Sequence, residues 1–286
     1  MIEASAQRAG VIGWPIEHSR SPTIHRYWLK ELGIPGSYEK FAVRPEEFRQ
    51  FADTIGGHGF RGANVTAPHK EAAFDACDRR TPVAEALGAV NTLWRQDDQL
   101  WGDNTDVAGF LANLDESAPG WAAQRKLAVV IGAGGAARGI IHALISRGFE
   151  RVAIVNRTQA RAETLAAHFG ASTTATPWED LTTELRRANL LVNASTLGMV
   201  GHPPLSVDVG PLPDEAVVTD AVYAPLRTPL IEAARARRLR VAEGLGMLLH
   251  QAAPSFARWF GQRPVVTPAL RALVEAEVMA TTGAAQ

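Results

Sequence analysis

Apolar and polar positions alternate along the first hundred residues in short runs. The apolar runs 9–15, 37–43 and 60–66 predict strands, while the amphipathic stretches 21–33 and 45–56 predict helices with a proline near each start. Strands that alternate with helices in this way are typical of a mainly parallel sheet covered by helices. The first part of the chain is therefore predicted to form an α/β domain.

A second alternating pattern begins after the polar, Pro- and Gly-containing stretch 113–124. It opens with a short strand, a glycine-rich turn and a helix over 126–149. Further strands are predicted at 151–158, 189–195 and 216–223, and further helices at 159–170 and 229–239. This is the doubly wound pattern of a dinucleotide-binding domain.

The last two helical stretches, 248–261 and 267–282, add no strand to the second domain, and we expect them to return to the first. The predicted division is therefore a discontinuous substrate-binding and catalytic domain, 1–106 with 244–286, and a dinucleotide-binding domain, 107–243. The fold class is α/β with two domains, the second of Rossmann type.

Composition narrows the class of partner. The chain has 286 residues and a formal net charge of -1, so no global field attracts nucleic acid or an anionic membrane, and we expect small-molecule partners. Cys77 is the only cysteine, which excludes an intramolecular disulfide and favours a reducing compartment. No apolar run approaches the roughly 18 residues of a membrane span, and no signal peptide is evident. We expect a cytoplasmic protein.

The glycine-rich turn 132-GAGGAA-137 predicts a dinucleotide site. Gly132, Gly134 and Ala137 fit G-x-G-x-x-G/A directly between a strand and a helix. Glycine at the first two positions permits a tight turn and a close approach of the backbone to a pyrophosphate, which the start of the helix then binds.

The next strand indicates which dinucleotide is bound. An NAD site needs an Asp or Glu near its end, but this strand ends in Asn156, Arg157 and Thr158. The Arg157 guanidinium suits a 2′-phosphate, and its neighbours can donate hydrogen bonds to one. The sequence therefore favours NADP(H), although Arg157 in an ordinary exposed loop is the alternative.

Four further stretches carry small hydroxyl, amide and carboxyl side chains after strands or before helices: 18-HSRSP-22, 64-NVTAPHK-70, 88-GAVNT-92 and 102-GDNTD-106. Ligands bind at the carboxyl ends of parallel strands, so these groups favour a small polyhydroxylated ligand. No further His, Cys or carboxylate lies at ligand spacing beside His18 or His69, so no metal site is predicted. Trp94 and Trp101 alternate with polar residues, which predicts a hairpin.

Together these motifs resemble the shikimate dehydrogenase family, which the pattern matches in order over nearly the whole chain. The matching segments are 13-GWPIEHSRSPTIH-25, 64-NVTAPHK-70, 88-GAVNT-92, 102-GDNTD-106, 132-GAGGA-136, 156-NRT-158, 193-NASTLGM-199, 220-DAVYAPLRTPL-230 and 243-EGLGMLLHQ-251. The resemblance implies NADP-dependent interconversion of 3-dehydroshikimate and shikimate, in the pathway to chorismate and the aromatic amino acids. The expected state is a monomer or a homodimer, and the sequence does not distinguish the two.

The resemblance also implies residue roles. Lys70 and Asp106 match the catalytic pair. Ser19, Ser21 and Tyr223 would bind the substrate carboxylate, and Asn64, Thr66, Asn91 and Gln251 would bind ring hydroxyls or complete the pocket. The cofactor would contact Gly132, Gly134, Gly135, Ala136, Asn156, Arg157, Thr158, Gly244 and Met247.

Several of these residues also have ordinary structural explanations. Asp106 and Ser21 could be helix N-caps, Tyr223 could be the last buried aromatic residue of its strand, and Gln251 could lie on the surface. A Lys within reach of a reacting ketone oxygen, in contrast, supplies the charge and the proton that hydride addition requires.

Two positions depart from the family pattern, and two other functions compete with the one it implies. Arg26 stands where the family usually has Asn, and Val107 where it usually has Gly, which puts the placement of the Asp106 carboxylate in question. The competing functions are a quinate or quinate/shikimate dehydrogenase that uses NAD, and a non-catalytic shikimate-sensing module. Retention of both Lys70 and Asp106 favours an enzyme.

Overall fold

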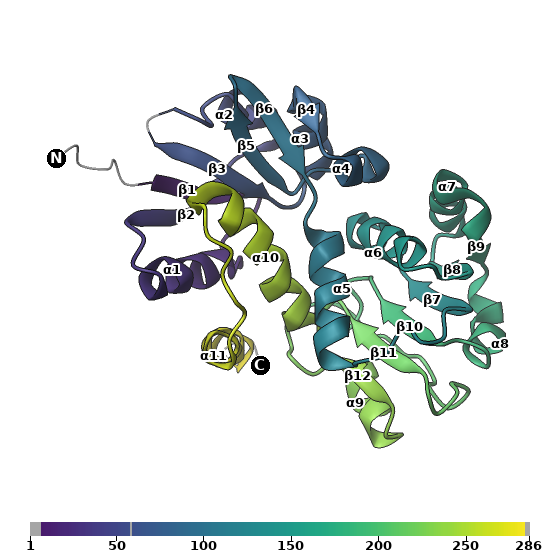
Figure 1. Ribbon diagram of the computed structural model, residues 1–286. Coiled ribbons are helices and arrows are strands. Elements are labelled where there is room, and N and C mark those ends of the chain that lie inside the picture. Colours follow the sequence, from purple (N-terminus) through teal and green to yellow (C-terminus); the bar gives the residue numbers. More distant parts are fainter. Residues whose placement is uncertain (1–6, 58, 284–286) are drawn as a thin grey trace. The chain divides into compact units, whose positions relative to one another are not determined.

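The computed structural model describes residues 7–57 and 59–283, which form two compact units with one sheet each (Figure 1). The first unit comprises residues up to Thr105 and Gln251–Val274, and the second comprises Asp106–His250 and the residues from Glu275. The unit boundary therefore falls inside helix α10 (Gly244–Phe260), whereas the sequence analysis assigns the whole of 244–286 to the first domain. The assignment of substrate binding and catalysis to one domain and of dinucleotide binding to the other stays a prediction.

The first unit is built on a six-stranded sheet with strand order β2-β1-β3-β5-β6-β4. Its elements before Thr105 are β1 Gln7–Gly13, α1 Ser21–Glu31, β2 Gly36–Ala42, η1 Pro45–Glu47, α2 Phe48–Ala52, β3 Phe60–Val65, α3 Lys70–Ala76, β4 Arg79–Arg80, α4 Pro82–Leu87, β5 Thr92–Gln96 and β6 Gln99–Asp103. Strand β1 pairs in parallel with β2 and β3, and β4 pairs in parallel with β6. Strands β3, β5 and β6 are antiparallel neighbours.

The antiparallel part of this sheet confirms the predicted hairpin. Trp94 in β5 lies opposite Trp101 in β6, and their rings stack with centroids 5.9 Å apart. The helix predicted at 45–56 is shorter in the structure. The 3₁₀ helix η1 covers Pro45–Glu47, α2 ends at Ala52, and a turn follows it.

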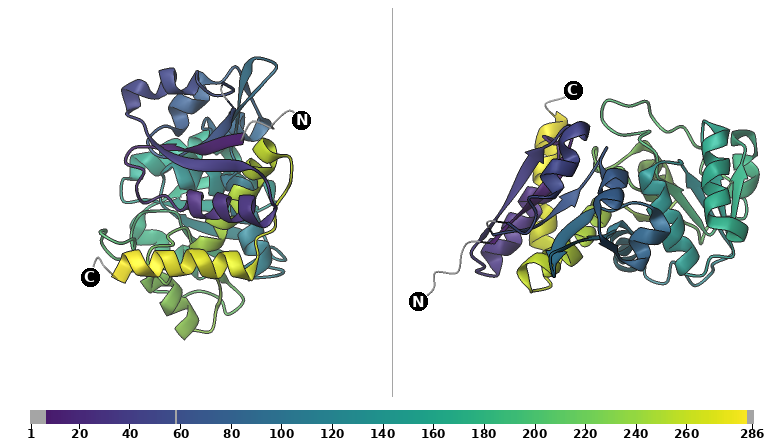
Figure 2. Two further views of the ribbon diagram at one scale, coloured as in Figure 1. Left: turned by 90° about the vertical axis from the view of Figure 1, so that its left-hand side faces the viewer. Right: turned by 90° about the horizontal axis from the view of Figure 1, so that it is seen from above.

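Helix α1 and the start of helix α11 (Pro268–Gly283) lie side by side in the first unit (Figure 2), and the segment that leads into α11 contacts α1. The Trp28 indole Nε1 donates a hydrogen bond to the Val265 carbonyl oxygen at 3.1 Å, and the Tyr27 and Thr267 hydroxyls lie 3.4 Å apart. These contacts bring a carboxy-terminal segment to the first unit, as expected from the pattern.

The second unit contains a wholly parallel sheet with strand order β12-β11-β10-β7-β8-β9. Its elements are α5 Asp106–Ser117, β7 Leu127–Ile131, α6 Gly135–Ser146, β8 Arg151–Val155, α7 Gln159–Phe169, η2 Gly170–Ser172, β9 Thr173–Thr176, η3 Trp178–Asp180, α8 Leu181–Leu185, β10 Leu190–Asn193, β11 Val217–Asp220, α9 Pro229–Ala236 and β12 Arg240–Ala242. Read from β9, this is the order 3-2-1-4-5-6 of two mononucleotide-binding halves. The predicted Rossmann-type fold is confirmed.

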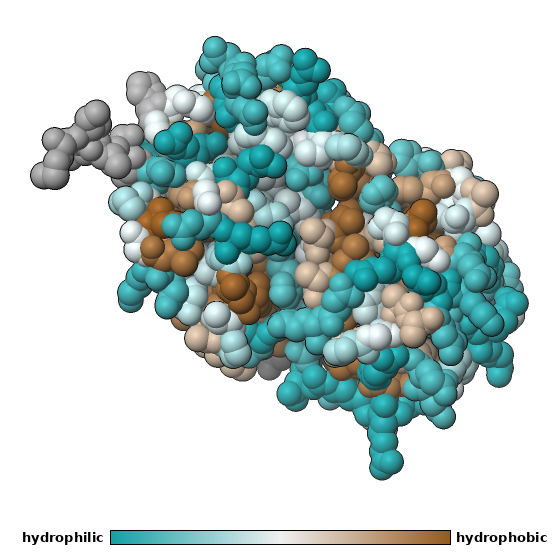
Figure 3. Space-filling view, in the orientation of Figure 1, coloured by the Kyte–Doolittle hydropathy of each residue, from teal (hydrophilic) through white to brown (hydrophobic). Residues whose placement is uncertain are grey.

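The strands of this parallel sheet are buried on both faces, so they appear in the sequence as continuous apolar runs. All five residues of β7 are buried, and one side of the sheet packs on Leu181, Leu185, Leu230 and Ala234. None of the described helices is long and apolar enough to cross a membrane. Mainly hydrophilic residues cover the face drawn in Figure 3.

Candidate functional site

Lys70 is the first residue of α3 and is half-buried. The preceding His69 is buried: its ring stacks on Phe48 with centroids 5.0 Å apart, and its Nε2 lies 2.8 Å from the Val43 carbonyl oxygen. Burial lowers the pKa of His69 and so favours the neutral ring. The proton is on Nε2, because the Val43 carbonyl oxygen can only accept a hydrogen bond. The Val90 N–H donates to the Lys70 carbonyl oxygen at 2.9 Å, so the predicted stretches 64–70 and 88–92 are neighbours.

Ser19 and Ser21 lie where the chain turns from β1 into α1. The Ser21 N–H donates to the Ser19 hydroxyl at 3.4 Å. Arg20 occupies the N-cap position of α1, so the alternative that Ser21 caps the helix is wrong. Burial raises the pKa of the Tyr38 hydroxyl well above its usual range, and a hydrogen bond with the Ser21 side chain offsets this in part.

Asn64, at the end of β3, is 5% exposed, and both the oxygen and the nitrogen of its side-chain amide contact other protein groups. Its Oδ1 accepts a hydrogen bond from the Tyr38 hydroxyl at 2.7 Å. Its Nδ2 lies 3.2 Å from the Asn91 carbonyl oxygen, 3.2 Å from Thr92 Oγ1 and 3.0 Å from Ser255 Oγ. The contact with a carbonyl oxygen fixes which side of the amide is nitrogen.

Asn91 lies at the centre of the same network. Its Oδ1 accepts from the Thr105 N–H at 2.9 Å, the Thr105 hydroxyl at 3.2 Å and the Thr92 hydroxyl at 3.0 Å. Its Nδ2 donates to Gln251 Oε1 at 3.2 Å. Three of the predicted site residues, Asn64, Asn91 and Gln251, are thus brought together. Gln251 is half-buried and bonded, so the alternative of a plain surface residue is wrong.

Thr66 is the first residue after β3 and is half-buried. Its N–H donates to the Ile12 carbonyl oxygen at 2.9 Å, and a Cβ at position 13 would lie 2.7 Å from its methyl group. Glycine at position 13 therefore leaves room for Thr66 beside the end of β1.

The predicted site residues do not include Tyr38, Thr92, Thr105 or Ser255. A signal was present for three of them: Thr92 and Thr105 lie inside the quoted motifs, and Ser255 follows Gln251 by four residues, which places it on the same face of α10. Tyr38 had no such signal, because it looks like an ordinary residue of a buried strand.

His25 and Arg26 lie against the same tyrosine. The His25 ring is fully buried and stacks on Tyr38 with centroids 4.0 Å apart. Burial lowers the pKa of His25 to about 3, and the Asn64 side chain offsets this in part. Arg26, the first departure from the family pattern, donates from Nε to the Tyr38 carbonyl oxygen at 2.8 Å. This substitution is thus accommodated by a backbone hydrogen bond.

In the second unit, the glycine-rich turn has the geometry of an anion-binding site. Gly132 has φ +117°, and a Cβ there would lie 2.9 Å from backbone atoms of Ala194 and Ser195. At Gly134 and Gly135 a Cβ would meet nothing within 4 Å. Gly134 is the N-cap of the 12-residue helix α6 and offers no capping side chain, so the first N–H groups of α6 are accessible to a phosphate. Ala136 is half-buried in the first turn.

The end of β8 lies next to this turn, since β7 and β8 pair in parallel. Arg157 and Thr158 are exposed there, and Asn156 Nδ2 donates to the Thr158 carbonyl oxygen at 2.9 Å. Thr158 is the N-cap of α7 without a side-chain capping bond. The charged and polar groups predicted for a 2′-phosphate are therefore on the surface at the edge of the sheet that carries the glycine turn.

Asp106 is the first residue of α5 and is 8% exposed. A Cβ at Gly139 of α6 would lie 3.5 Å from the Asp106 Cβ, an ordinary van der Waals distance, so α6 packs closely beside Asp106. Val107, the second departure from the family pattern, lies within α5 and is not among the described non-glycine residues with positive φ. The β-branched side chain therefore imposes no unusual backbone on the residue after Asp106.

Tyr223 lies beyond β11, which ends at Asp220 and not at 223 as predicted. The Asp220 carboxylate ends the strand by accepting the Val222 N–H at 2.9 Å, together with Asn193 Nδ2 at 2.9 Å and the Thr228 hydroxyl at 2.6 Å. Burial raises the pKa of Asp220, and these three bonds offset the rise in part. Tyr223 is half-buried outside the strand, so the alternative of a last buried strand residue is wrong.

Gly244, predicted as a cofactor residue, also has a packing role. A Cβ there would lie 2.5 Å from the Val222 carbonyl oxygen, so the start of α10 fits against the end of β11 only with glycine. Met247 is half-buried one turn further along the helix.

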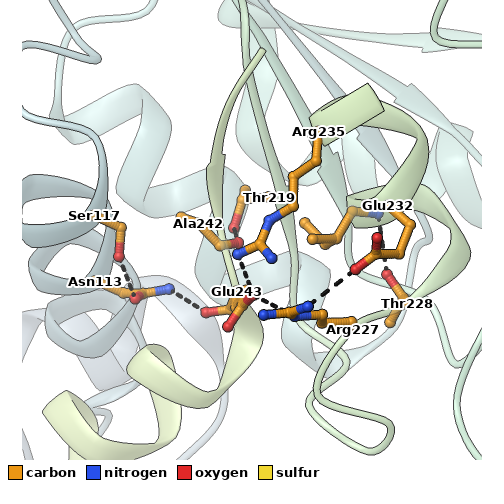
Figure 4. A network of polar contacts seen from close by, with 10 residues as sticks. Asn113, Ser117, Thr219, Arg227, Thr228, Glu232, Arg235, Ala242 and Glu243 are labelled. Atoms are coloured by element: carbon orange, nitrogen blue, oxygen red, sulfur yellow. Dashed lines mark hydrogen bonds and ion pairs between the residues drawn. The ribbon is translucent and has the colours of Figure 1, made fainter. Parts of the chain in front are cut away.

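The segment before Gly244 is held by the polar network of Figure 4. The Glu243 carboxylate contacts Arg235 at 2.6 Å and Arg227 at 3.9 Å, and the Glu243 carbonyl oxygen accepts from Asn113 Nδ2 at 2.9 Å. Arg227 also lies 3.8 Å from Glu232. These contacts hold the end of β12 between α5 and α9, which fixes the start of α10. The described residues contain no group of three or more His, Cys, Asp or Glu that could hold a metal ion.

Comparison with known proteins identifies the family. A model described as the shikimate dehydrogenase substrate binding domain matches residues 11–93, one described as shikimate / quinate 5-dehydrogenase matches 116–198, and one described as the shikimate 5'-dehydrogenase C-terminal domain matches 244–274. The shikimate dehydrogenase (NADP(+)) of Methylocella silvestris is 59% identical over 277 residues, covering 97% of this chain and 99% of the relative. That of Brucella abortus is 53% identical over 284 residues, covering 98% of both.

Solved structures agree with this result. Shikimate 5-dehydrogenase from Thermus thermophilus, in complex with NADP(H) and shikimate, has a TM-score of 0.83 and 36% identity over 95% of this chain and 99% of its own. Quinate dehydrogenase from Corynebacterium glutamicum, in complex with NAD, has a TM-score of 0.88 and 29% identity, with the same coverage. With relatives of this identity over nearly their full length, the chain belongs to the shikimate dehydrogenase family.

Proposed function

We propose that this chain is an NADP-dependent oxidoreductase that reversibly reduces 3-dehydroshikimate to shikimate, a step toward chorismate and the aromatic amino acids. The observation that carries the proposal is the buried network that joins Asn64, Asn91 and Gln251, because an array of amides and hydroxyls suits a small polyhydroxylated ligand. Relatives named shikimate dehydrogenase (NADP(+)) at 51% to 59% identity support it.

The substrate residues are those of the sequence analysis. Ser19, Ser21 and Tyr223 bind the carboxylate, and Asn64, Thr66, Asn91 and Gln251 bind the ring hydroxyls or shape the pocket. The two serine side chains of the Ser19–Ser21 turn, of which Ser19 is half-buried and Ser21 buried, and the bonded amides support this division of roles. The predicted functional domains, 1–106 with 244–286 and 107–243, are part of the same proposal.

The cofactor residues of this proposal are Gly132, Gly134, Gly135 and Ala136 for the pyrophosphate and Asn156, Arg157 and Thr158 for the 2′-phosphate. Gly244 also contacts the cofactor, and Met247 lies beside the nicotinamide. The open backbone at the start of α6 and the exposed Arg157 support NADP(H). NADP(H), when bound, supplies or takes up the hydride. An NAD site usually has an Asp or Glu at the end of this strand that binds the ribose 2′-hydroxyl, and β8 has no carboxylate there.

Lys70 is proposed to donate the proton to the developing alkoxide when the ketone is reduced, and to take it back in the reverse reaction. An ammonium at this position also stabilises the negative charge as it forms. Asp106 is proposed as the second residue of the catalytic pair, and its carboxylate to accept a hydrogen bond from the substrate. The hydrogen-bonded His69, one residue earlier, supports the placement of Lys70 at the start of α3.

A quinate dehydrogenase is the second candidate, because such an enzyme in complex with NAD shares the fold with a TM-score of 0.88. The Asn156–Arg157–Thr158 sequence argues against NAD. A cytoplasmic location and a monomeric or homodimeric state complete the proposal.

The Lys70→Ala variant tests whether the chain catalyses the reaction or only binds the ligand. Calorimetric titration with shikimate and the rate of NADPH formation are measured on the same preparations. Loss of turnover by about 1000-fold with binding retained supports the catalytic role, in line with removal of a general acid–base group. Unchanged turnover would contradict the role of Lys70, and binding without turnover in the wild-type protein would favour a sensor.

A further inference from the structure

The hydrogen-bond directions in the buried network can be assigned from one fixed point. The backbone N–H of Thr105 donates to Asn91 Oδ1 at 2.9 Å, and because a backbone N–H is only a donor, the oxygen of this amide faces Thr105. The Thr92 hydroxyl, 3.0 Å from the same oxygen, must therefore donate its single proton to Asn91.

This leaves one arrangement for Ser255. Its hydroxyl lies 2.7 Å from Thr92 Oγ1, whose proton is already used, so Ser255 donates to Thr92. Ser255 then accepts from Asn64 Nδ2 at 3.0 Å. The side chain is 0% exposed, and no other hydrogen-bond partner among the described residues competes for it.

The same assignment determines which end of Gln251 is available. Asn91 Nδ2 donates to Gln251 Oε1 at 3.2 Å. The Thr105 hydroxyl lies 3.2 Å from Asn91 Oδ1 and 3.3 Å from Gln251 Oε1, so its single proton is shared between these two oxygens. Within the described chain no group accepts a hydrogen bond from Gln251 Nε2. A rotated Gln251 would place its NH₂ group against the NH₂ group of Asn91, and two donors repel.

We propose that Ser255 is a positioning residue of the substrate site: through Thr92 and Asn91 it fixes the Gln251 amide so that Nε2 donates to a hydroxyl oxygen of the substrate. The chain of bonds runs from Asn64 to Ser255, Thr92, Asn91 and finally Gln251. Ser255 and Gln251 also share one face of α10, being four residues apart. This inference rests on the proposed function, since it names how one residue of that site recognises the ligand.

The test compares Ser255→Ala and the isosteric Thr92→Val with wild-type enzyme in shikimate oxidation. We expect the KM for shikimate to rise about fivefold to tenfold, with kcat and the KM for NADP changed less than about twofold, as for loss of one ligand hydrogen bond. In a Gln251→Ala background, Ser255→Ala should add no further increase. Ser146→Ala is the control, because that hydroxyl bonds only to the Ala143 carbonyl of its own helix.

Two results would overturn the inference: a KM for shikimate within twofold of wild type in both variants, or a full additional effect of Ser255→Ala in the Gln251→Ala background. Normal wild-type turnover with either result means that the inference alone fails. Absence of wild-type turnover would mean that the proposed function fails.

The network is then tested on the free protein by hydrogen exchange of the Asn91 side-chain NH₂ group. Ser255→Ala should accelerate this exchange, and an unchanged exchange rate would show that Ser255 does not hold the network.

Discussion

The Trp259 indole occupies the space that a side chain at position 62 would need. A Cβ at Gly62 would lie 2.1 Å from Trp259 Nε1 and 2.2 Å from the Leu93 carbonyl oxygen, and the same Nε1 donates to that oxygen at 3.0 Å. Trp259 follows Ser255 by four residues, as Ser255 follows Gln251, so the three share one face of α10. Trp259 bonds to β5, Ser255 bonds to β3 and β5, and Gln251 bonds to Asn91, the residue before β5. The position of Gln251 therefore depends on the packing of Trp259.

The Gly62→Ala variant should be less stable than wild type. Neither the indole nor the backbone carbonyl can move freely, so overpacking of this kind is expected to cost about 1–3 kcal/mol of the free energy of unfolding. Urea denaturation measures the change, with Gly135→Ala as control because a Cβ there meets nothing within 4 Å. Equal stability of Gly62→Ala and wild type would show that the packing of Trp259 is not tight.

The stability of the protein should depend on His25 in acid. Burial lowers the pKa of His25 from 6.5 to about 3, so the unfolded chain binds a proton in this range that the folded protein does not. The free energy of unfolding is unaffected by this group above pH 6.5 and falls as the pH drops from about 6.5 to about 3, by at most about 1.4 kcal/mol per pH unit.

His25→Phe keeps an aromatic ring on Tyr38 and removes the titrating group, so its stability should fall less steeply in this pH range. Urea denaturation at several pH values measures the slope. Burial also lowers the pKa of His69 and His142, so part of the dependence should remain. An identical slope in the variant and wild type would contradict the assignment to His25.

Arg157→Ala should change the preference between dinucleotides. If the guanidinium binds the 2′-phosphate, its loss should raise the KM for NADP by about tenfold or more and leave the KM for NAD nearly unchanged, because NAD lacks this phosphate. Initial rates with each dinucleotide measure both constants. Arg147→Ala, which removes a pair with Asp115 at the other end of α6, is the control. An equal effect on both dinucleotides would contradict this role.

Thr228→Val should destabilise the second unit. The Thr228 hydroxyl donates to Asp220 Oδ2 at 2.6 Å and accepts from the Ile231 N–H at 3.4 Å, so the isosteric change removes a helix cap and a buried bond to a carboxyl group. We expect a loss of about 1–3 kcal/mol, measured by thermal or urea unfolding. Thr164→Val is the control, because its exposed hydroxyl bonds only to the Ala160 carbonyl. Comparable losses in both variants would contradict a special role for Thr228.

Much of the fold could be predicted from the sequence because periodicity and glycine carry strong local signals. The runs that became β7, α6 and β8 were recognised since parallel strands buried on both faces are continuously apolar. The short strands β9 and β12 were missed, because three or four residues give no periodicity. The start of α10 was placed four residues late, since Gly244 and Gly246 are poor helix formers and only the packing of Gly244 against Val222 explains the helix there.

For the candidate site, the family motifs indicated residues whose side chains can contact a ligand, and they missed those that orient them. Tyr38 lies in an ordinary buried strand, and Ser255 has only the indirect signal of its spacing from Gln251. The contacts of both with Asn64 appear only when β2 and α10 bring them together. A long-range contact of this kind has no local sequence pattern.

The central claim is tested most directly by initial rates of oxidation of shikimate and of quinate, each with NADP and with NAD, followed by nicotinamide absorbance on purified protein. We predict that the pair shikimate and NADP gives the highest kcat/KM. Turnover mainly with quinate and NAD would contradict the proposed substrate and the assignment of Arg157, and no turnover with any pair would contradict an enzymatic function.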